Sequence, residues 1–184
     1  MTIDDELLLA LTEKKDQAPS FLEKMVKSDT ISYQLEEELF TQLPSGQTID
    51  MIPDVVVTIN PSAIPERQVR VIIELENDYD WDFQSSLRQI KKYKNYFYRG
   101  AQFRREFIAI IPKSYERFVR LYRNEVIPVW LWSATRVWEC MRCGKIIEND
   151  KIIKPKCTEK KCGSNEVGLK GIINVIFEPT PETI

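Results

Sequence analysis

The spacing of apolar and polar residues separates the chain into helical and extended stretches. Residues 3–43 carry apolar positions at helical spacing, which predicts three helices there. The first is built around an apolar cluster, the second covers residues 21–28, and the third covers residues 31–43 and ends at Pro44. The apolar cluster consists of Leu7, Leu8 and Leu11.

Extended segments dominate the next part of the chain. Residues 54–59 and 69–76 are rich in valine and isoleucine, and the long loop between them suits an antiparallel hairpin. The elements predicted after this hairpin are a helix over about residues 84–98, a strand over 107–111, a helix over 114–123 and a strand over 126–132. This order predicts an α/β fold, in which helices flank a mixed sheet.

The composition changes beyond residue 136 to cysteine, glycine and lysine. We therefore predict one domain over residues 1–135 and a second, smaller domain over residues 136–184. Residues 172–177 form a last apolar strand, and the sequence leaves open whether it belongs to the small domain or to the main sheet.

The overall composition excludes several classes of protein. The chain contains no histidine, which excludes catalytic centres and metal sites that need an imidazole. The net charge of −2 provides no global positive field, so any attraction for nucleic acid has to be local. The apolar runs are too short to cross a bilayer and the N-terminus is acidic, so we expect a cytoplasmic protein without a membrane segment.

All four cysteines fall in the predicted small domain, in the pattern C-x2-C-x13-C-x4-C. Two pairs on separate turns can surround one tetrahedral ion, and a glycine directly after each pair lets the backbone turn toward the sulfurs. Two disulfides would need an oxidising compartment, which nothing in the sequence indicates. We therefore predict a zinc ribbon with a structural Zn²⁺ that stabilises the fold of this domain. The predicted ligands are Cys140, Cys143, Cys157 and Cys162.

Lysines make the predicted ribbon basic. Contact with nucleic acid, contact with a protein partner and a merely solvated surface are all compatible with this charge. The lysines are Lys145, Lys151, Lys154, Lys156, Lys160, Lys161 and Lys170.

Carboxylates lie at the ends of both strands of the predicted hairpin. Asp54 opens the first strand, and Glu74 and Glu76 close the second. Alternation places Leu75 in the core, and antiparallel pairing places Asp54 across from Glu74. Carboxylates held on stiff β-structure suit a hard divalent cation, so we predict a Mg²⁺ or Mn²⁺ site at this edge.

The same residues resemble a nuclease family. Pro53-Asp54 followed by Glu74-x-Glu76 resembles the PD-(D/E)xK nuclease superfamily, whose members have a restriction-endonuclease-like core. Gln89 and Tyr93, which are four residues apart on the predicted helix, resemble the Q-x3-Y motif of its RecB-type members. The resemblance covers about residues 31–132.

This resemblance implies a role for each matched residue. Asp54, Glu74 and the backbone carbonyl of Leu75 would bind the catalytic Mg²⁺ or Mn²⁺. Gln89 and Tyr93 would shape the pocket beside that ion.

One position departs from the family pattern. Glu76 stands where the family has a lysine that activates the attacking water. Glu76 itself could bind metal or accept the proton of the water, Lys91 or Lys92 could reach in from the helix, or the site could be inactive. Family members often add a glutamate from the first core helix, and Glu36 is the candidate because it lies inside the apolar arc of the predicted helix 31–43.

Basic and aromatic residues alternate after the acidic strands. Between Arg88 and Arg105 the chain has seven basic residues and no acidic one, a composition typical of surfaces that bind a nucleic acid strand. We therefore expect a metal-dependent nuclease that cleaves DNA rather than RNA. Two alternatives stay open: an inactive nucleic-acid-binding module on the same fold, and an adaptor whose zinc ribbon binds a protein partner.

Overall fold

The computed structural model describes most of the chain. The described residues are 3–13, 28–35, 39–42, 48–61, 69–78, 82–97, 104–151 and 153–180. Their side chains are described for residues 5–11, 52–58, 71–78, 82–92, 107–151 and 153–180. None of the helices in these ranges has the length and hydrophobicity that a bilayer crossing requires.

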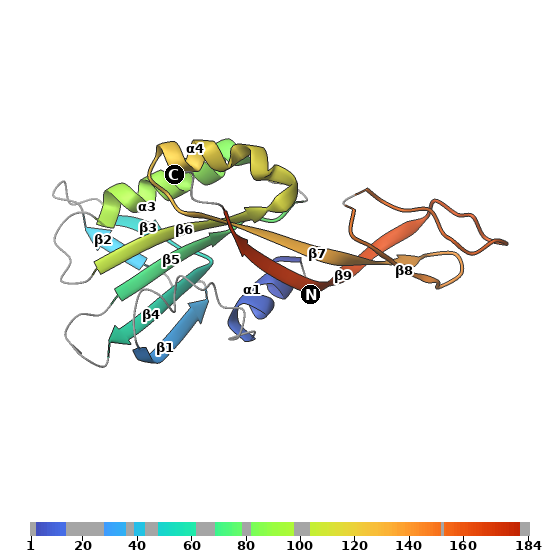
Figure 1. The fold of residues 1–184 in the computed structure, drawn as a ribbon, viewed down its shortest axis with the longest axis horizontal. Helices are drawn as coiled ribbons and strands as arrows, with labels where there is room; N and C mark the ends of the chain where they lie inside the picture. The colour runs from blue at the N-terminus through green and yellow to red at the C-terminus, as the bar shows by residue number, and fades with distance from the viewer. Residues whose placement is uncertain are drawn as a thin grey trace.

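A mixed sheet forms the centre of the protein (Figure 1). Its first three strands are antiparallel neighbours, and the next two continue the sheet in parallel. The antiparallel strands are β1 (Ser28–Leu35), β4 (Val55–Pro61) and β5 (Val69–Leu75). The parallel strands are β6 (Arg104–Pro112) and β7 (Val129–Cys140).

Two of the remaining strands pair with β7 and two form a sheet of their own. β8 (Ile146–Asn149) and β9 (Val167–Pro179) both pair antiparallel with β7, and β8 and the first half of β9 project away from the main body (Figure 1). β2 (Leu39–Gln42) and β3 (Thr48–Met51) form a separate two-stranded sheet.

Helices cover both faces of the sheet (Figure 1). On one face, α3 (Phe83–Phe97) and α4 (Val119–Asn124), which follows the 3₁₀ helix η2 (Lys113–Phe118), enclose a core that contains Ile90 and Tyr122. On the opposite face, α1 (Ile3–Glu13) packs Leu7 and Leu11 against alternate residues of β4, β5 and β6. The predicted α/β class, with helices flanking a mixed sheet, is therefore confirmed.

A carboxylate fixes α1 to the last strand. Glu6 accepts a hydrogen bond from the backbone amide of Ile172 in β9, at 2.5 Å. A Cβ atom on the neighbouring Gly171 would clash with the Glu6 carboxylate, so a larger residue at this position would displace Glu6 from its hydrogen bond to Ile172.

Most of the predicted elements are present. The antiparallel hairpin appears as β4 and β5, and the helix predicted over residues 84–98 appears as α3. The strand predicted over residues 107–111 is the centre of β6, and the helix predicted over 114–123 divides into η2 and α4. The strand predicted over 126–132 begins three residues later and is longer than expected. It begins later because Val126 has a positive φ of 58° and ends the preceding turn.

The helix predicted over residues 31–43 is wrong. Residues 28–35 form β1, which pairs with β4 along its length, and residues 39–42 form β2. Ile31, Tyr33 and Leu35 alternate with polar residues, and the hydrogen bonds to β4 favour this strand pattern over the helical one. Glu36 and residues 21–27 of the helix expected over residues 21–28 lie outside the described residues, and Ser28 is the first residue of β1.

The main sheet and the cysteine part of the chain share two strands. β7 runs through the expected boundary at residues 135–136, and its register with β9 is formed on both sides, from Trp130 opposite Pro179 to Cys140 opposite Val167. The strand predicted over residues 172–177 is the centre of β9, which therefore belongs to both parts. We call the projecting part, residues 136–172, the cysteine ribbon.

Candidate metal centres

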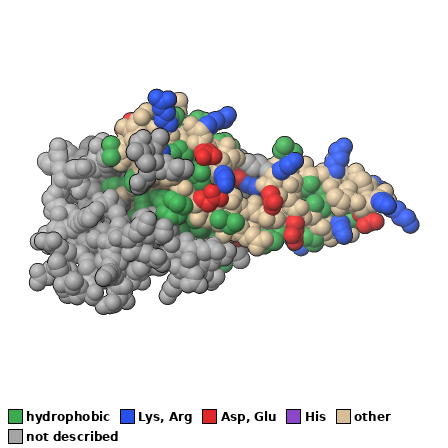
Figure 2. Space-filling view, in the orientation of Figure 1, with side chains coloured by type: hydrophobic (Ala, Val, Ile, Leu, Met, Phe, Trp, Pro, Cys, Tyr) green, Lys and Arg blue, Asp and Glu red, His purple; other side chains and the backbone are tan. Residues whose placement is uncertain are grey.

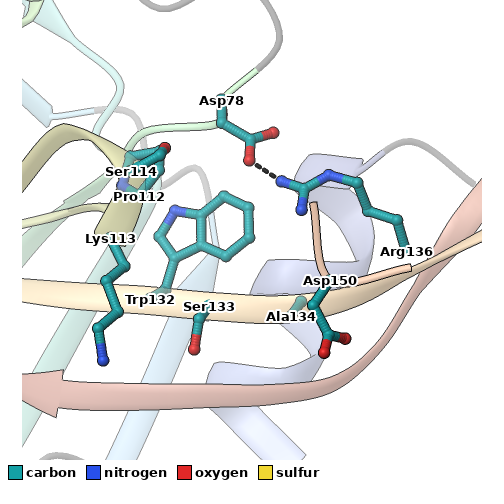
Figure 3. Close-up of a pocket in the computed structure, with 9 residues that line it drawn as sticks. All are labelled: Asp78, Pro112, Lys113, Ser114, Trp132, Ser133, Ala134, Arg136 and Asp150. Atoms are coloured by element: carbon teal, nitrogen blue, oxygen red, sulfur yellow. Dashed lines mark ion pairs between the residues drawn. The ribbon is translucent and has the colours of Figure 1, made fainter. Parts of the chain in front are cut away.

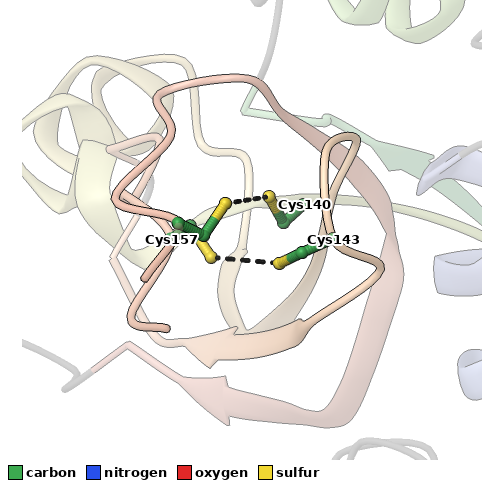
Figure 4. A group of neighbouring side chains, drawn as sticks. Cys140, Cys143 and Cys157 are labelled. Atoms are coloured by element: carbon green, nitrogen blue, oxygen red, sulfur yellow. Dashed lines mark hydrogen bonds between the residues drawn. The ribbon is translucent and has the colours of Figure 1, made fainter. Parts of the chain in front are cut away.

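Four sulfur atoms meet in the cysteine ribbon. The ligand atoms of Cys140, Cys143, Cys157 and Cys162 all lie within 4.8 Å of one another. The Sγ atoms of Cys143 and Cys157 are 3.5 Å apart, and those of Cys140 and Cys162 are 3.7 Å apart (Figure 4). This spacing fits four thiolates around one tetrahedral Zn²⁺, in a closed site of the structural kind.

Two tight turns bring the cysteine pairs to this point. The amide of Gly144 donates to the carbonyl of Cys140 at 2.8 Å, and the amide of Gly163 donates to the carbonyl of Glu159 at 3.1 Å. Both glycines have positive φ, 71° and 53° respectively, which other residues rarely adopt. Each glycine therefore supplies the left-handed backbone conformation that its turn needs.

The thiols of this cluster differ in their tendency to ionise. Burial raises the pKa of Cys140, but hydrogen bonds from the backbone amides of Arg142 and Cys143 lower it to about 7. At Cys143 the Lys145 amide lowers the pKa, whereas burial and the neighbouring thiols raise it, to about 12. One thiolate therefore forms near neutral pH, and a full set of four thiolates needs a cation to offset their charge.

Zinc binding should consequently release protons. At Cys157 the Glu159 amide and the Cys143 thiol lower the pKa, but burial and the thiols of Cys140 and Cys162 raise it more. Cys143 and Cys157 are therefore both protonated at pH 7 without metal. We expect binding at pH 7 to release about two protons or more per ion, and the affinity to fall about 100-fold for each unit by which the pH is lowered. Titration calorimetry in buffers of different ionisation enthalpy measures this release. A value near zero would contradict thiolate coordination, and Cys157→Ser should lower the number by about one.

The second candidate centre lies at the edge of the β4–β5 hairpin. The register places Val55 opposite Ile73, so the next pair outward is Asp54 and Glu74, whose side chains leave the same face of the sheet. Asp54 accepts a hydrogen bond from the backbone amide of Leu75 through Oδ2, at 2.6 Å. The structure thus brings the two acids to one edge, while the side chain of Leu75 points into the core on the other face.

Helix α3 covers this edge. Glu74 is only 4% exposed, and Gln89 donates a hydrogen bond from Nε2 to Glu74 Oε2 at 3.2 Å. Glu74 leaves the sheet on the α3 side because its β6 neighbour, Ala109, belongs to the core under α3. Residues from two strands and one helix therefore converge here, which we call the acid edge: Asp54, Glu74 and Gln89.

The other predicted site residues are placed differently. Glu76 does not join Asp54 and Glu74 in a compact group of three, since within the described residues only the cysteines form such a group. Lys91 forms an ion pair with Glu125 at 2.6 Å, and Lys92 is exposed.

Tyr93 lies in α3 one turn after Gln89, and its side chain is outside the described part of the chain.

Three residues that the sequence analysis did not select surround the segment after Glu74. Asp78 and Arg136 form a buried ion pair, and Trp132 Nε1 donates a hydrogen bond to the carbonyl of Glu76 at 2.7 Å. Burial lowers the pKa of the Arg136 guanidinium. The feature of the sequence that indicates this pair is an arginine, Arg136, at an inward position of a strand. A buried cation needs a partner of opposite charge.

Sequence comparisons assign no family. No protein-family model matches this chain, and no curated protein is significantly similar to it. The chemistry of the two centres therefore has to be inferred from their own residues.

Proposed function

We propose that this protein is a divalent-metal-dependent nuclease of the PD-(D/E)xK type, which hydrolyses phosphodiester bonds of DNA. The observation that carries the proposal is the convergence of Asp54, Glu74 and Gln89 at the acid edge. Two carboxylates from neighbouring chain segments, one of them almost fully buried, would repel each other in a medium of low polarity when both are ionised. A divalent cation would remove this repulsion and would use both groups as ligands.

The order of the elements supports the same proposal. An acid directly before β4, an acid near the end of β5 and a glutamine on the following helix α3 occur in the order expected from the resemblance. α3 also connects β5 to the parallel strand β6, so it crosses the face from which both acids project. Gln89, the first residue of the Q-x3-Y pattern, contacts Glu74 directly.

The chemistry would be a metal-assisted hydrolysis. Asp54, Glu74 and the Leu75 carbonyl would hold Mg²⁺ or Mn²⁺, and the ion would stabilise the charge that develops on the phosphate. A water oxygen forms the new bond to phosphorus, the bond to one sugar oxygen breaks, and that oxygen takes up a proton. Glu76 or Lys92 would orient the water and accept its proton, and Tyr93 would complete the pocket with Gln89.

The cysteine ribbon would contribute to substrate binding. Its lysines are exposed. Basic side chains stand at the tip and along the visible edges of the projecting end, with acidic ones between them (Figure 2), and phosphate groups can approach the basic ones there. This charge also favours the second candidate function, a nucleic-acid-binding module without catalysis. The exposed lysines are Lys145, Lys151, Lys154, Lys156, Lys160, Lys161 and Lys170.

One experiment separates these functions. Purified protein is incubated with single-stranded and double-stranded DNA in Mg²⁺, in Mn²⁺ and in EDTA. A nuclease yields products only with a divalent ion, whereas a binding module retains salt-dependent affinity and yields no product with any metal. A protein-interaction adaptor shows neither binding at moderate salt nor cleavage.

A further inference from the structure

The segment that carries the candidate acids continues beyond the sheet. We call residues 74–78 the acid segment; it begins with the last two residues of β5 and ends with Asp78. Its start is held by the sheet and by Asp54, and the Glu76 amide donates to the carbonyl of Ile110 in β6 at 2.9 Å. All of its residues belong to the described part of the chain, and its last residue, Asp78, contacts strand β7.

Strand β7 holds the far end of the acid segment through two contacts. Trp132 Nε1 donates to the carbonyl of Glu76 at 2.7 Å, and Arg136 pairs with Asp78 (Figure 3). Trp132 is 1% exposed and its hydrogen bond to Glu76 is partly buried. Both members of the ion pair are buried, so salt screens this pair only weakly.

A pocket lies beside these two contacts. It has a volume of about 230 Å³ and lies between the acid segment, the end of β6 and β7 (Figure 3). Asp78, Trp132 and Arg136 form part of its wall. Asp78 is the residue of the acid segment that lines this pocket, so the end of the segment is held by the ion pair with Arg136 rather than by apolar packing.

Arg136 also lies at the root of the cysteine ribbon. In the register of the sheet Arg136 lies opposite Asn149 of β8 on one side and opposite Ile172 of β9 on the other. It precedes the first cysteine, Cys140, by four residues. The ion pair thus connects the acid segment to the point where three strands of the ribbon meet.

We infer that Trp132 and Arg136 are positioning residues, which fix the acid segment so that Glu74 and the carbonyl of Leu75 keep the geometry needed to bind a divalent cation. The expected effect on cation binding rests on the proposed function, because the inference names the residues that hold the acids of that same site. Neither residue touches the metal or the substrate in this role. Trp132 acts through the backbone of Glu76, and Arg136 acts through Asp78.

The chain offers a matched control for Trp132. Trp138 lies on the same strand and is 8% exposed, and its indole N–H makes no hydrogen bond among the described residues. Trp132→Phe and Trp138→Phe therefore remove the same group from buried sites, but only the first removes a bond to the acid segment. Arg136→Lys is the mild variant of the ion pair, because it keeps the charge and loses the planar guanidinium.

Amide hydrogen exchange, followed by NMR in the full-length zinc-bound protein, tests the positioning itself. We expect Trp132→Phe to accelerate exchange at the amides of Leu75 and Glu76 about five- to tenfold, with a smaller effect of Arg136→Lys. The Ile127 amide, which donates to Tyr122 in the α4 turn, should remain unchanged. Equal rates at Leu75 and Glu76 in Trp132→Phe and Trp138→Phe would overturn the inference.

Mn²⁺ binding tests the consequence separately. Titration of the same variants should give an affinity about tenfold weaker for Trp132→Phe than for the wild type, with no change for Trp138→Phe. If the wild type binds Mn²⁺ and both variants bind it equally well, the positioning role is refuted while the proposed function stands. If the wild type binds no Mn²⁺, the proposed function fails, and the exchange rates still decide whether Trp132 and Arg136 fix the segment.

Discussion

Asp54→Asn and Glu74→Gln should each lower Mn²⁺-dependent DNA cleavage about 1,000-fold or more, with little effect on folding. Each substitution removes one negative charge from the proposed ion and retains the size of the side chain. Asparagine at position 54 also keeps an oxygen that can accept the hydrogen bond from the Leu75 amide. It is therefore a cleaner test than alanine, which would release this backbone amide and loosen the hairpin.

Single-turnover cleavage rates and thermal unfolding should be measured together for these variants. Asp150→Asn provides the control, because Asp150 is an exposed aspartate that lies outside the acid edge and accepts a hydrogen bond from Thr135. We expect this control to cleave at the wild-type rate. Wild-type rates in Asp54→Asn would exclude Asp54 as a metal ligand, and a large loss of thermal stability would indicate a structural role instead.

Removal of zinc should unfold the cysteine ribbon. Among the described residues its own core contains only five that are buried, so little apolar burial remains once the metal is lost. Zinc binding contributes about 10–16 kcal/mol to folds of this size, far more than such a core can replace. The five residues are Trp138, Cys140, Ile147, Cys157 and Val167.

Trp138 reports on this loss. Treatment with a zinc chelator, or the substitution Cys157→Ser, should shift Trp138 fluorescence to the red, and added zinc should reverse the shift in the wild type only. Subtracting the spectrum of Trp138→Phe from that of the wild type isolates the Trp138 fluorescence from that of Trp130 and Trp132 in the main core. An unchanged spectrum, with the loss of zinc verified by elemental analysis, would contradict a metal-dependent ribbon.

The parts of the fold that the sequence predicts well are those with one unambiguous period. Valine and isoleucine at successive positions of β4 and β5 suit only extended structure, and α3 repeats its apolar residues at helical spacing over four turns. Segment 31–43 carries both periods, because Leu35 and Leu39 are four apart whereas Ile31, Tyr33 and Leu35 are two apart. Pairing with β4 decides between them, and a local pattern does not contain that information.

The site could be predicted where it depends on local alternation, and not where it depends on long-range contacts. Alternation along two adjacent strands suffices to place Asp54 opposite Glu74. Asp78 and Arg136 are 58 positions apart in the sequence, and their pairing can be predicted only if β7 is known to continue beyond Trp132. Burial in β7 alternates as far as Cys140, so Arg136 is an inward residue on a strand that the apolar pattern alone ends too early.

The central claim is that Asp54 and Glu74 share one divalent cation, and anomalous diffraction from crystals grown with Mn²⁺ tests it most directly. Data collected on both sides of the manganese edge distinguish this ion from zinc at the cysteines. We predict a manganese peak at the acid edge, about 2.1 Å from a carboxylate oxygen of Asp54 and from one of Glu74. The absence of manganese there at saturating concentration, with both side chains ordered and zinc present at the four cysteines, would contradict the claim.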